Sequence, residues 1–257
     1  MTSDLVGVVL AAGAGTRLRP LTHVRPKALC PVDNVALVDR ALARLRPVVK
    51  RIAVNVCHGR DQLEAHLAAR GVHVSIEAPQ ALGTAGALGQ LRDWVDGRDV
   101  LVLNVDVYHP HALDSFVAGW DRSRVRLLTV RDLPRADFDG RRYCGAAVLP
   151  WTVVRDIPAE RLGLHQAVFA PHADTGRLEL VESTVAYFDC GTPGEYLAAN
   201  LAASGGESVI GEGAVIEGEV VRSVVWPGAR VRPGERLVDA IRATDDITVH
   251  VHGPERP

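Results

Sequence analysis

The chain has few of the residues that mark disulfide-bonded, metal-cluster or membrane proteins. Only four cysteines occur in 257 residues and no two form a CxxC pair, which argues against a disulfide framework or a zinc site. The ten histidines show no metal-binding spacing such as HExxH, and His109 and His111 are interpreted as loop or cap residues. The first residues form no long apolar helix, so we expect neither export nor a membrane span, and a cytoplasmic location. The cysteines, interpreted as reduced core thiols, are Cys30, Cys57, Cys144 and Cys190.

An excess of charge of one sign is also absent. The formal net charge is −2, which argues against a general nucleic-acid or membrane surface. Any anionic ligand must therefore be attracted by locally concentrated charge. A hydrophobic content of 47% with 23% charged residues is typical of a globular protein, and 257 residues can bury one large α/β core with a small appendage.

Local positive charge is concentrated close to the N-terminus. An apolar run, residues 5–10, predicts a strand that leads directly into Gly13 and Gly15. Glycine lets the backbone turn tightly and bring its N–H groups close to phosphate oxygens. No Asp or Glu lies between Asp4 and Asp33 to neutralise the four cations that follow, so the segment suits a nucleoside triphosphate. These cations are Arg17, Arg19, Arg25 and Lys27.

Short apolar runs alternate with helical patterns along most of the chain. This alternation is typical of βαβ units and predicts an α/β fold with a Rossmann-like, mostly parallel sheet flanked by helices. Thr192-Pro193 supplies a cap and a first-turn proline for a last helix ending at Ala203. Residues 151–183 show no clear pattern. The predicted strands are 6–10, 51–56, 72–77, 100–105, 124–130 and 143–149, and the predicted helices are 36–45, 61–69 and 85–94.

The composition changes after residue 204. Apolar pairs recur six residues apart at Val209-Ile210 and Val215-Ile216, with glycines at 211, 213 and 218. A six-residue period with small corner residues predicts a short three-sided parallel β-helix, and an antiparallel tail packed on the core is the alternative. We therefore predict a core domain over 1–204 and a short hexapeptide-repeat, β-helix-like tail over 205–257. Because so short a β-helix exposes its ends, we expect a homodimer formed through this tail.

Dinucleotide binding is the first function to weigh for the glycine turn. Gly13-Ala14-Gly15 begins a G-x-G-x-x-G fingerprint, but Leu18 occupies the third glycine position and prolines 20, 26 and 31 follow where a Rossmann helix should open. The acidic residue that would bind the ribose is expected at the end of the second strand, whereas Asp33 precedes the second predicted strand. Both departures argue against dinucleotide binding. A P-loop is excluded because no Gly-Lys-Ser/Thr follows the turn.

Four separate stretches together resemble one known family. They are residues 10–27 with Arg25-Pro26-Lys27 at their end, the loop Leu82–Leu88, the strand end Leu103–Asp106, and Asp189-Cys190-Gly191-Thr192-Pro193. In this order they are similar to the motifs of sugar-1-phosphate nucleotidylyltransferases, and most similar to mannose-1-phosphate guanylyltransferase-like members. The likeness covers most of the chain, and 129–183 is its weak part. It implies that 1–204 is the catalytic domain, and the C-terminal stretch is similar to the left-handed β-helix appended to many members of the family.

The resemblance implies roles for individual residues. Arg17 would contact pyrophosphate, Lys27 the α-phosphate or the sugar phosphate, and Asp106 and Asp189 would bind Mg²⁺. The alternatives without a role in binding are a solvated surface charge for each of the two cations, a strand-end cap for Asp106 and a turn residue for Asp189. The implied catalytic residues are Arg17, Lys27 and Asp106; the nucleotide-binding residues are Leu10, Ala11, Ala12, Gly13, Gly15, Thr16, Gly83, Thr84 and Asn104; and the sugar-phosphate residues are Tyr143 and Gly145.

The reaction implied is attack of a sugar 1-phosphate on the α-phosphorus of a nucleoside triphosphate. The attacking phosphate has its second pKa at about 6, so no general base is required. The site must align two polyanions and neutralise charge, for which Mg²⁺ with one or two carboxylates is suited. The loop 82–88 favours GTP. The family's Glu-Lys-Pro stretch is missing, so Arg141 or Arg142 would have to hold the acceptor phosphate, and the acceptor would be an unusual sugar or cyclitol phosphate.

Two other classes of function remain as alternatives. A regulatory homologue that binds nucleotide sugar without catalysis would be expected to lack one of the four residues Arg17, Lys27, Asp106 or Asp189, and all are present. An acyltransferase in the tail would need a longer β-helix with a catalytic histidine, whereas His250 and His252 lie beyond the repeats. The predicted partners are therefore small molecules, a nucleoside triphosphate and a sugar 1-phosphate.

Overall fold

The computed structural model of the chain describes residues 5–251. These residues form two compact units, each made of several segments of the chain. The sheet unit comprises residues 5–14, 38–105 and 109–187, and the coil unit comprises residues 15–37, 106–108 and 188–251. The predicted domain boundary at residue 204 stays a prediction.

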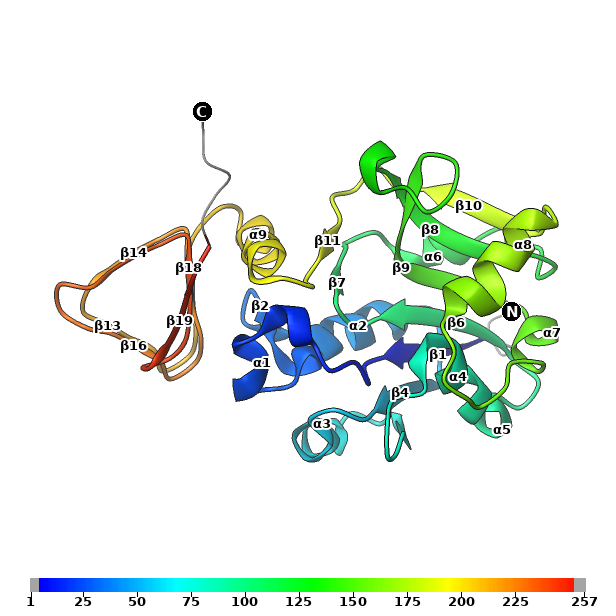
Figure 1. The fold of residues 1–257 in the computed structure, drawn as a ribbon, viewed down its shortest axis with the longest axis horizontal. Coiled ribbons are helices and arrows are strands. Elements are labelled where there is room, and N and C mark those ends of the chain that lie inside the picture. The colour runs from blue at the N-terminus through cyan, green and yellow to red at the C-terminus, as the bar shows by residue number, and fades with distance from the viewer. Residues whose placement is uncertain (1–4, 252–257) are drawn as a thin grey trace. The chain divides into compact units, whose positions relative to one another are not determined.

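A seven-stranded sheet is the centre of the sheet unit, in the order β10-β8-β9-β6-β1-β4-β5 (Figure 1). Strand β1 is parallel to β4 and β6, and only β9 runs antiparallel to its neighbours. The predicted mostly parallel sheet is confirmed. The strands are β1 (Leu5–Leu10), β4 (Ile52–Val56), β5 (His73–Ile76), β6 (Asp99–Asn104), β8 (Val125–Arg131), β9 (Arg141–Leu149) and β10 (Leu178–Glu182).

Helices flank this sheet and bury their apolar side chains against it. Leu88 and Leu91 of the α4 region and Phe169 pack with strand residues such as Val8 and Val102 in one core. The helix predicted over 85–94 is two helices that break at Leu91, and 151–183 contains several short elements. The helices are α2 (Leu37–Leu45), α3 (Arg60–Leu67), α4 (Gly83–Gln90), α5 (Arg92–Val95), α6 (Leu113–Val117), α7 (Trp151–Val154), a π-helical turn (His165–Phe169) and α8 (Ala170–Asp174), with a 3-10 turn at Leu133–Arg135.

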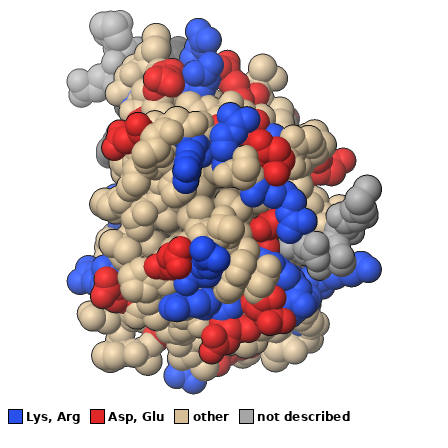
Figure 2. All heavy atoms as spheres, turned by 90° about the vertical axis from the view of Figure 1, so that its right-hand side faces the viewer, with Lys and Arg blue, Asp and Glu red and all other residues tan. Residues whose placement is uncertain are grey.

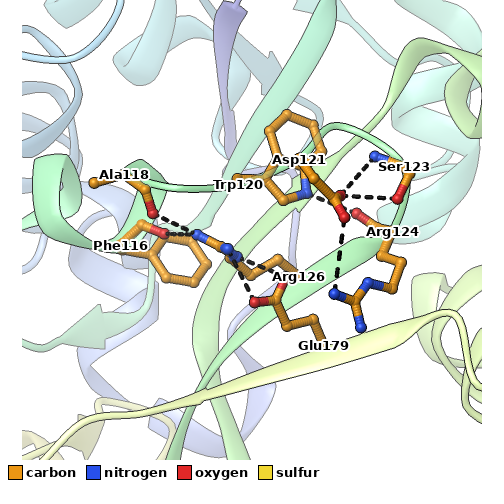
Figure 3. Close-up of polar contacts among 8 residues, drawn as sticks. All are labelled: Phe116, Ala118, Trp120, Asp121, Ser123, Arg124, Arg126 and Glu179. Atoms are coloured by element: carbon orange, nitrogen blue, oxygen red, sulfur yellow. Dashed lines mark hydrogen bonds and ion pairs between the residues drawn. The ribbon is translucent and has the colours of Figure 1, made fainter.

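One buried arginine ties three of these elements together. The Arg126 guanidinium, on β8, donates to both carboxylate oxygens of Glu179 on β10, at 3.0 and 2.9 Å (Figure 3). It also donates to the carbonyl oxygens of Phe116 and Ala118 at the end of α6, both at 2.9 Å. A bidentate pair with two added carbonyl acceptors satisfies a charge that would otherwise be costly to bury, so edge strand β10 is held in register beside β8.

Parallel coils form the C-terminal part of the coil unit. Val209 pairs with Val224, Val215 with Arg230 and Glu219 with Arg236, so each coil places three short strands beside those of the next. The predicted β-helix-like segment is confirmed, and only the last hairpin is antiparallel. Its strands are β12 (Val209–Ile210), β13 (Val215–Ile216), β14 (Glu219–Val221), β15 (Val224–Val225), β16 (Arg230–Val231), β17 (Arg236–Val238), β18 (Ala240–Thr244) and β19 (Ile247–His250).

The remaining elements of the coil unit are short, apart from one helix. Helix α9 (Pro193–Ala203) begins as predicted, with the Thr192 hydroxyl accepting from the Glu195 N–H at 3.3 Å. The segment 15–37, in which prolines 20, 26 and 31 were interpreted as excluding a Rossmann helix, contains single turns of helix separated by these prolines. These elements are a 3-10 turn (Thr16–Leu18), α1 (Leu21–Val24), a second 3-10 turn (Lys27–Leu29), β2 (Pro31–Val32), β3 (Val35–Ala36), β7 (Val107–Tyr108) and β11 (Phe188–Asp189).

Surface and thiol properties agree with the composition. Figure 2 shows acidic and basic side chains interspersed on the face that it draws.

Within residues 5–251, no helix has both the length and the apolar character needed to cross a bilayer. All four cysteines are free thiols, and burial raises the pKa of Cys30 and of Cys144 to about 12.

Candidate functional site

The glycine turn after β1 is held on one side and open on the other. The Ala11 N–H donates to the Asn55 side-chain oxygen at 2.6 Å, and His58 Nδ1 lies 2.9 Å from the Ala12 carbonyl oxygen. At Gly13, by contrast, an added Cβ atom would meet nothing within 4 Å. The backbone at Gly13 is therefore accessible to a ligand while its flanking residues are fixed.

Two predicted nucleotide residues lie side by side at the edge of the sheet where β1 ends. Leu10 is in register with Asn104 of β6, and the Val105 N–H donates to the Leu10 carbonyl at 3.2 Å. The carboxyl ends of parallel strands are where open α/β sheets bind ligands. The structure thus brings Leu10, Ala11, Ala12, Gly13 and Asn104 together.

The loop that opens α4 is fixed by a distant segment. The Thr84 hydroxyl oxygen accepts from the Leu164 N–H at 2.7 Å, and the Leu162 carbonyl accepts from the Ala85 N–H at 2.9 Å. Gly83 has φ +76° and its added Cβ would meet the Leu162 carbonyl oxygen at 2.6 Å. Gly83 and Thr84 begin α4, the structural alternative to nucleotide contact, and both also fix this loop to residues 162–164. Their contact with nucleotide stays a prediction.

Asn55 and Glu77 were missed by sequence reasoning, although both are buried at this same edge of the sheet. Asn55 is 3% exposed near the end of β4, and Glu77 is 2% exposed directly after β5. Buried polar side chains must find hydrogen-bond partners. The available signal was a polar residue at the carboxyl end of an apolar strand, the same signal that singled out Asp106.

In the coil unit, residues 15–31, here called the basic loop because they carry the four cations named above, pack closely around a glycine. Gly15 has φ +60°, and its added Cβ would lie 3.0 Å from Cβ of Lys27. The Thr22 hydroxyl donates to the Gly15 carbonyl at 3.1 Å, and exposed Thr16 begins the first 3-10 turn. A side chain at position 15 would therefore crowd Lys27.

Lys27 extends from this loop to the predicted metal residue. Its Nζ donates to Asp106 Oδ2 at 2.6 Å, and its side chain is 10% exposed. Asp106 lies next to the second aspartate because β7 pairs with β11, with Val107 opposite Asp189 and the Cys190 N–H donating to the Asp106 carbonyl at 2.8 Å. Two residues predicted from separate motifs are thus adjacent.

Asp189 shows the electrostatic effect of this arrangement. Burial of the carboxyl raises its pKa, and the nearby charge of Asp106 raises it further. Arg17 Nη2 lies 3.9 Å from Asp189 Oδ2. At Gly191 an added Cβ would meet Arg17 Nη2 at 2.8 Å and Asp189 Oδ1 at 2.9 Å. A side chain at position 191 would therefore separate the arginine from the aspartate.

The two aspartates fit a hard divalent cation. Among residues 5–251, no group of three His, Cys, Asp or Glu side chains forms a metal cage. Mg²⁺ does not need one, because it binds through one or two carboxylates together with substrate phosphates and water. Two adjacent carboxylates, Asp106 and Asp189, form a donor set of that kind.

A second chain of contacts supports the basic loop. The Arg25 guanidinium carbon lies 4.5 Å from the centre of the Trp226 ring on the β-helix-like segment. The indole Nε1 donates to the Tyr196 hydroxyl at 3.0 Å, and this hydroxyl donates to the Pro31 carbonyl. Tyr196 and Trp226 are fully buried. Trp226 of the coils thus contacts Arg25 directly and is linked to Pro31 through Tyr196 of α9, so both ends of the segment that carries Lys27 are held.

The predicted acceptor residues lie on β9 in the sheet unit. Gly145 has φ +80° at a bulge where β9 shifts register against β8, so its glycine also has a structural reason. Arg141 Nε donates to Glu182 at 3.0 Å, and Arg142 lies 3.7 Å from Asp132 and over the Tyr187 ring. A hollow of about 440 Å³ is lined by Val130, Arg131, Asp132, Arg135, Glu182, Ser183, Thr184, Val185, Ala186 and Tyr187.

Comparison with known proteins identifies the family of this chain. Residues 7–211 match the MobA-like NTP transferase domain family. N-acetylmuramate alpha-1-phosphate uridylyltransferase of Caulobacter vibrioides is 40% identical over 132 residues, which are 47% of this chain and 54% of that protein. The chain therefore spans about half the length of this curated relative.

Solved structures share the fold at low sequence identity. A mannose-1-phosphate geranyltransferase from Thermus thermophilus superposes with a TM-score of 0.72 at 18% identity, covering 96% of this chain and 94% of that one. A putative glucose-1-phosphate thymidylyltransferase from Bacillus anthracis gives 0.68 at 20% identity, covering 77% and 95%. The first match extends over nearly all of both chains and so includes the C-terminal coils.

Proposed function

This chain belongs to the MobA-like NTP transferase domain family, and from that premise we propose that it transfers a nucleotidyl group from a nucleoside triphosphate to a sugar 1-phosphate or similar phosphate. The observation that carries the proposal is the contact of Lys27 with Asp106 beside Asp189. One buried cation and two adjacent carboxylates suit the handling of phosphate and a divalent ion.

The proposed chemistry needs positioning and charge neutralisation. An oxygen of the acceptor phosphate forms a bond to the α-phosphorus, and the bond to the bridging oxygen breaks, so that its electron pair leaves with pyrophosphate. Lys27 would bind oxygens of the α-phosphate or of the acceptor phosphate, and Arg17 those of the leaving pyrophosphate. Preorganised charges of this kind stabilise the charge that develops in the transition state.

Asp106 and Asp189 would hold Mg²⁺ in this proposal. A divalent cation bound there supplies charge neutralisation at the phosphate oxygens. Arg17 and Lys27 also place two positive charges against these carboxylates. The protein thereby limits repulsion between its own carboxylates and the phosphates of the substrate.

The nucleotide base and the acceptor are finer parts of the proposal. The loop Leu82–Leu88 supports GTP through its likeness to guanylyltransferases, and UTP is the second candidate because the 40% identical relative is a uridylyltransferase. For the acceptor, Arg142 would bind the phosphate group. Arg142 pairs with Asp132, and Asp132 lines the 440 Å³ hollow, so the acceptor phosphate would lie beside that hollow. An unusual sugar or cyclitol phosphate remains the proposed acceptor class.

Self-association through the C-terminal coils is a separate proposal. Ile210, Val215 and Ile216 are 38–45% exposed on β12 and β13, strands of the first coil. Apolar side chains on short edge strands favour pairing with another chain. Light scattering at several protein concentrations would detect a dimer, and a monomer at every concentration would refute it.

Pyrophosphate release tests the function directly. ATP, CTP, GTP, UTP and dTTP are each supplied with Mg²⁺ and a panel of sugar and cyclitol 1-phosphates. Release with one triphosphate and one acceptor, abolished in Asp106→Asn and retained in Asp246→Asn, would support the proposal. Asp246 is a matched control because it is an exposed aspartate of the same unit, in the turn between β18 and β19. Release that is unchanged in Asp106→Asn would reject it.

A further inference from the structure

A continuous chain of hydrogen bonds joins the glycine turn to the loop that opens α4. The Ala11 N–H donates to Asn55 Oδ1 at 2.6 Å, and Asn55 Nδ2 donates to Glu77 Oε1 at 2.7 Å. Glu77 Oε2 in turn accepts from the Leu82 N–H at 2.7 Å. All four residues belong to the sheet unit. Two backbone segments separated by 71 positions are therefore linked through only two side chains.

Each hydrogen bond in this linkage requires a donor on one side and an acceptor on the other. Asn55 must accept from Ala11 with its oxygen, so only its NH₂ group faces Glu77. Glu77 receives a donor at each oxygen, and a carboxylate is the side chain with two acceptors and no donor. Because Asn55 is 3% and Glu77 2% exposed, water has little access to replace a lost partner. The linkage therefore depends on the chemical identity of both residues.

The two ends of this linkage are the segments to which nucleotide contacts are assigned. Ala11 precedes the open Gly13, and Leu82 precedes Gly83 and Thr84. We propose that Asn55 and Glu77 are positioning residues that set the separation of these two segments and thereby the affinity for the nucleoside triphosphate. This inference rests on the proposed function, because it takes the bound molecule to be that substrate.

A general contribution to folding is the competing explanation, and a matched control separates it. Ser75, on β5 two residues before Glu77, is 6% exposed, and its hydroxyl accepts from Gln90 of α4 at 3.0 Å. Ser75→Ala removes a hydrogen bond between β5 and α4, the two elements that flank the segment from Glu77 to Leu82, and leaves Asn55 and Glu77 unchanged. It should lower the melting temperature and leave the KM for the triphosphate unchanged.

The test is an exchange of the two functional groups. In Glu77→Gln the new amide nitrogen faces another donor, either the Asn55 amide or the Leu82 N–H. In Asn55→Asp two carboxylates face each other. Each single variant therefore loses one hydrogen bond of the linkage. In the double variant the amide nitrogen at position 77 donates to the carboxylate at position 55. The other oxygen of that carboxylate accepts from Ala11, and the amide oxygen at position 77 accepts from Leu82. The exchange reverses the middle hydrogen bond and keeps the total charge.

The expected result is a rise of about tenfold in the KM for the triphosphate in each single variant, the effect of one lost hydrogen bond. The KM for the acceptor should not change, and the double variant should return the triphosphate KM to within about twofold of wild type. Single variants with an unchanged triphosphate KM, or a folded double variant without recovery, would overturn the inference. If a single variant does not fold, the KM of the double variant still decides.

Direct binding distinguishes this inference from the function on which it rests. Dissociation constants for ATP, CTP, GTP, UTP and dTTP are measured by equilibrium dialysis with Mg²⁺ on the wild type and on the variants. A wild type that binds none of the five triphosphates rejects the proposed function. A wild type that binds one of them as tightly as Glu77→Gln does would reject only the positioning role.

Discussion

Lys27 Nζ lies 2.6 Å from Asp106 Oδ2, in a pair whose lysine is 10% and whose aspartate is 31% exposed. The lysine approaches from the basic loop and the aspartate from the residue that precedes β7, 79 positions later in the chain. A lysine so little exposed is stable as a cation only with a partner. The same contact therefore holds the loop in place and presents a positive charge beside the two carboxylates.

Removing either member of this pair should abolish most of the activity. We expect Asp106→Asn and Lys27→Met each to lower kcat by a factor of about 10² to 10³, the usual effect of removing one preorganised group that stabilises the transition state. Because the two groups act as a unit, the double variant should lose little more than the worse single variant. Steady-state kinetics of all three variants measure this, and multiplicative losses would show that the groups act independently.

The two glycines of the turn should respond differently to alanine. Gly13 has open space around it, so Gly13→Ala should change the free energy of unfolding by less than about 1 kcal/mol while lowering nucleotide affinity. Gly15 has φ +60° and packs on Lys27, so Gly15→Ala should cost about 1–2 kcal/mol of stability. Urea denaturation and nucleotide titration of both variants check this. Equal nucleotide affinity of Gly13→Ala and wild type would contradict ligand approach at Gly13.

The Tyr196 hydroxyl should stabilise the packing of the coils against the basic loop. Tyr196→Phe leaves the Trp226 indole N–H and the Pro31 carbonyl buried without this partner, at an expected cost of about 2–4 kcal/mol. In a double-mutant cycle with Trp226→Phe, the combined cost should be smaller than the sum, because both variants remove one shared bond. Additive losses in urea denaturation would contradict the linkage.

His109 should make stability depend on pH below neutrality. Burial lowers the pKa of its imidazole from 6.5 to about 4 in the folded protein, and Nδ1 lies 3.0 Å from the Ala186 carbonyl oxygen, to which the neutral ring donates. Between these values the unfolded chain takes up a proton that the folded one does not, so stability falls as the pH falls. The loss should approach about 1.4 kcal/mol per pH unit and total on the order of 3 kcal/mol.

Denaturation at several pH values between 4 and 7 measures this dependence, and His109→Gln should flatten it because glutamine does not titrate. His250→Gln, at an exposed position of β19, is the control and should leave the slope as in wild type. A His109→Gln protein with the wild-type slope would assign the dependence to other groups.

Local pattern was sufficient wherever an element was long and periodic. The strand ending at Leu10 and the helix capped by Thr192 were predicted within one residue of their observed bounds, because burial and capping act on neighbouring positions. Residues 151–183 form turns and helices of four or five residues with edge strand β10. These are too short to show a period, and they are held by contacts such as Arg126 with Glu179 that only the folded chain brings about.

The chemical groups available to this protein could be recognised from the amino-acid sequence: a glycine turn after an apolar strand, four cations without neighbouring acidic residues, and the aspartates at positions 106 and 189. Their spacing along the chain also indicated the family. Folding was needed to show that Asp106 lies beside Asp189, that Arg25 stacks on Trp226, and that Asn55 and Glu77 connect the two loops. The physical reason is that hydrogen bonds and charge pairs depend on distance and direction, which strand register and helix packing set between residues far apart in the chain.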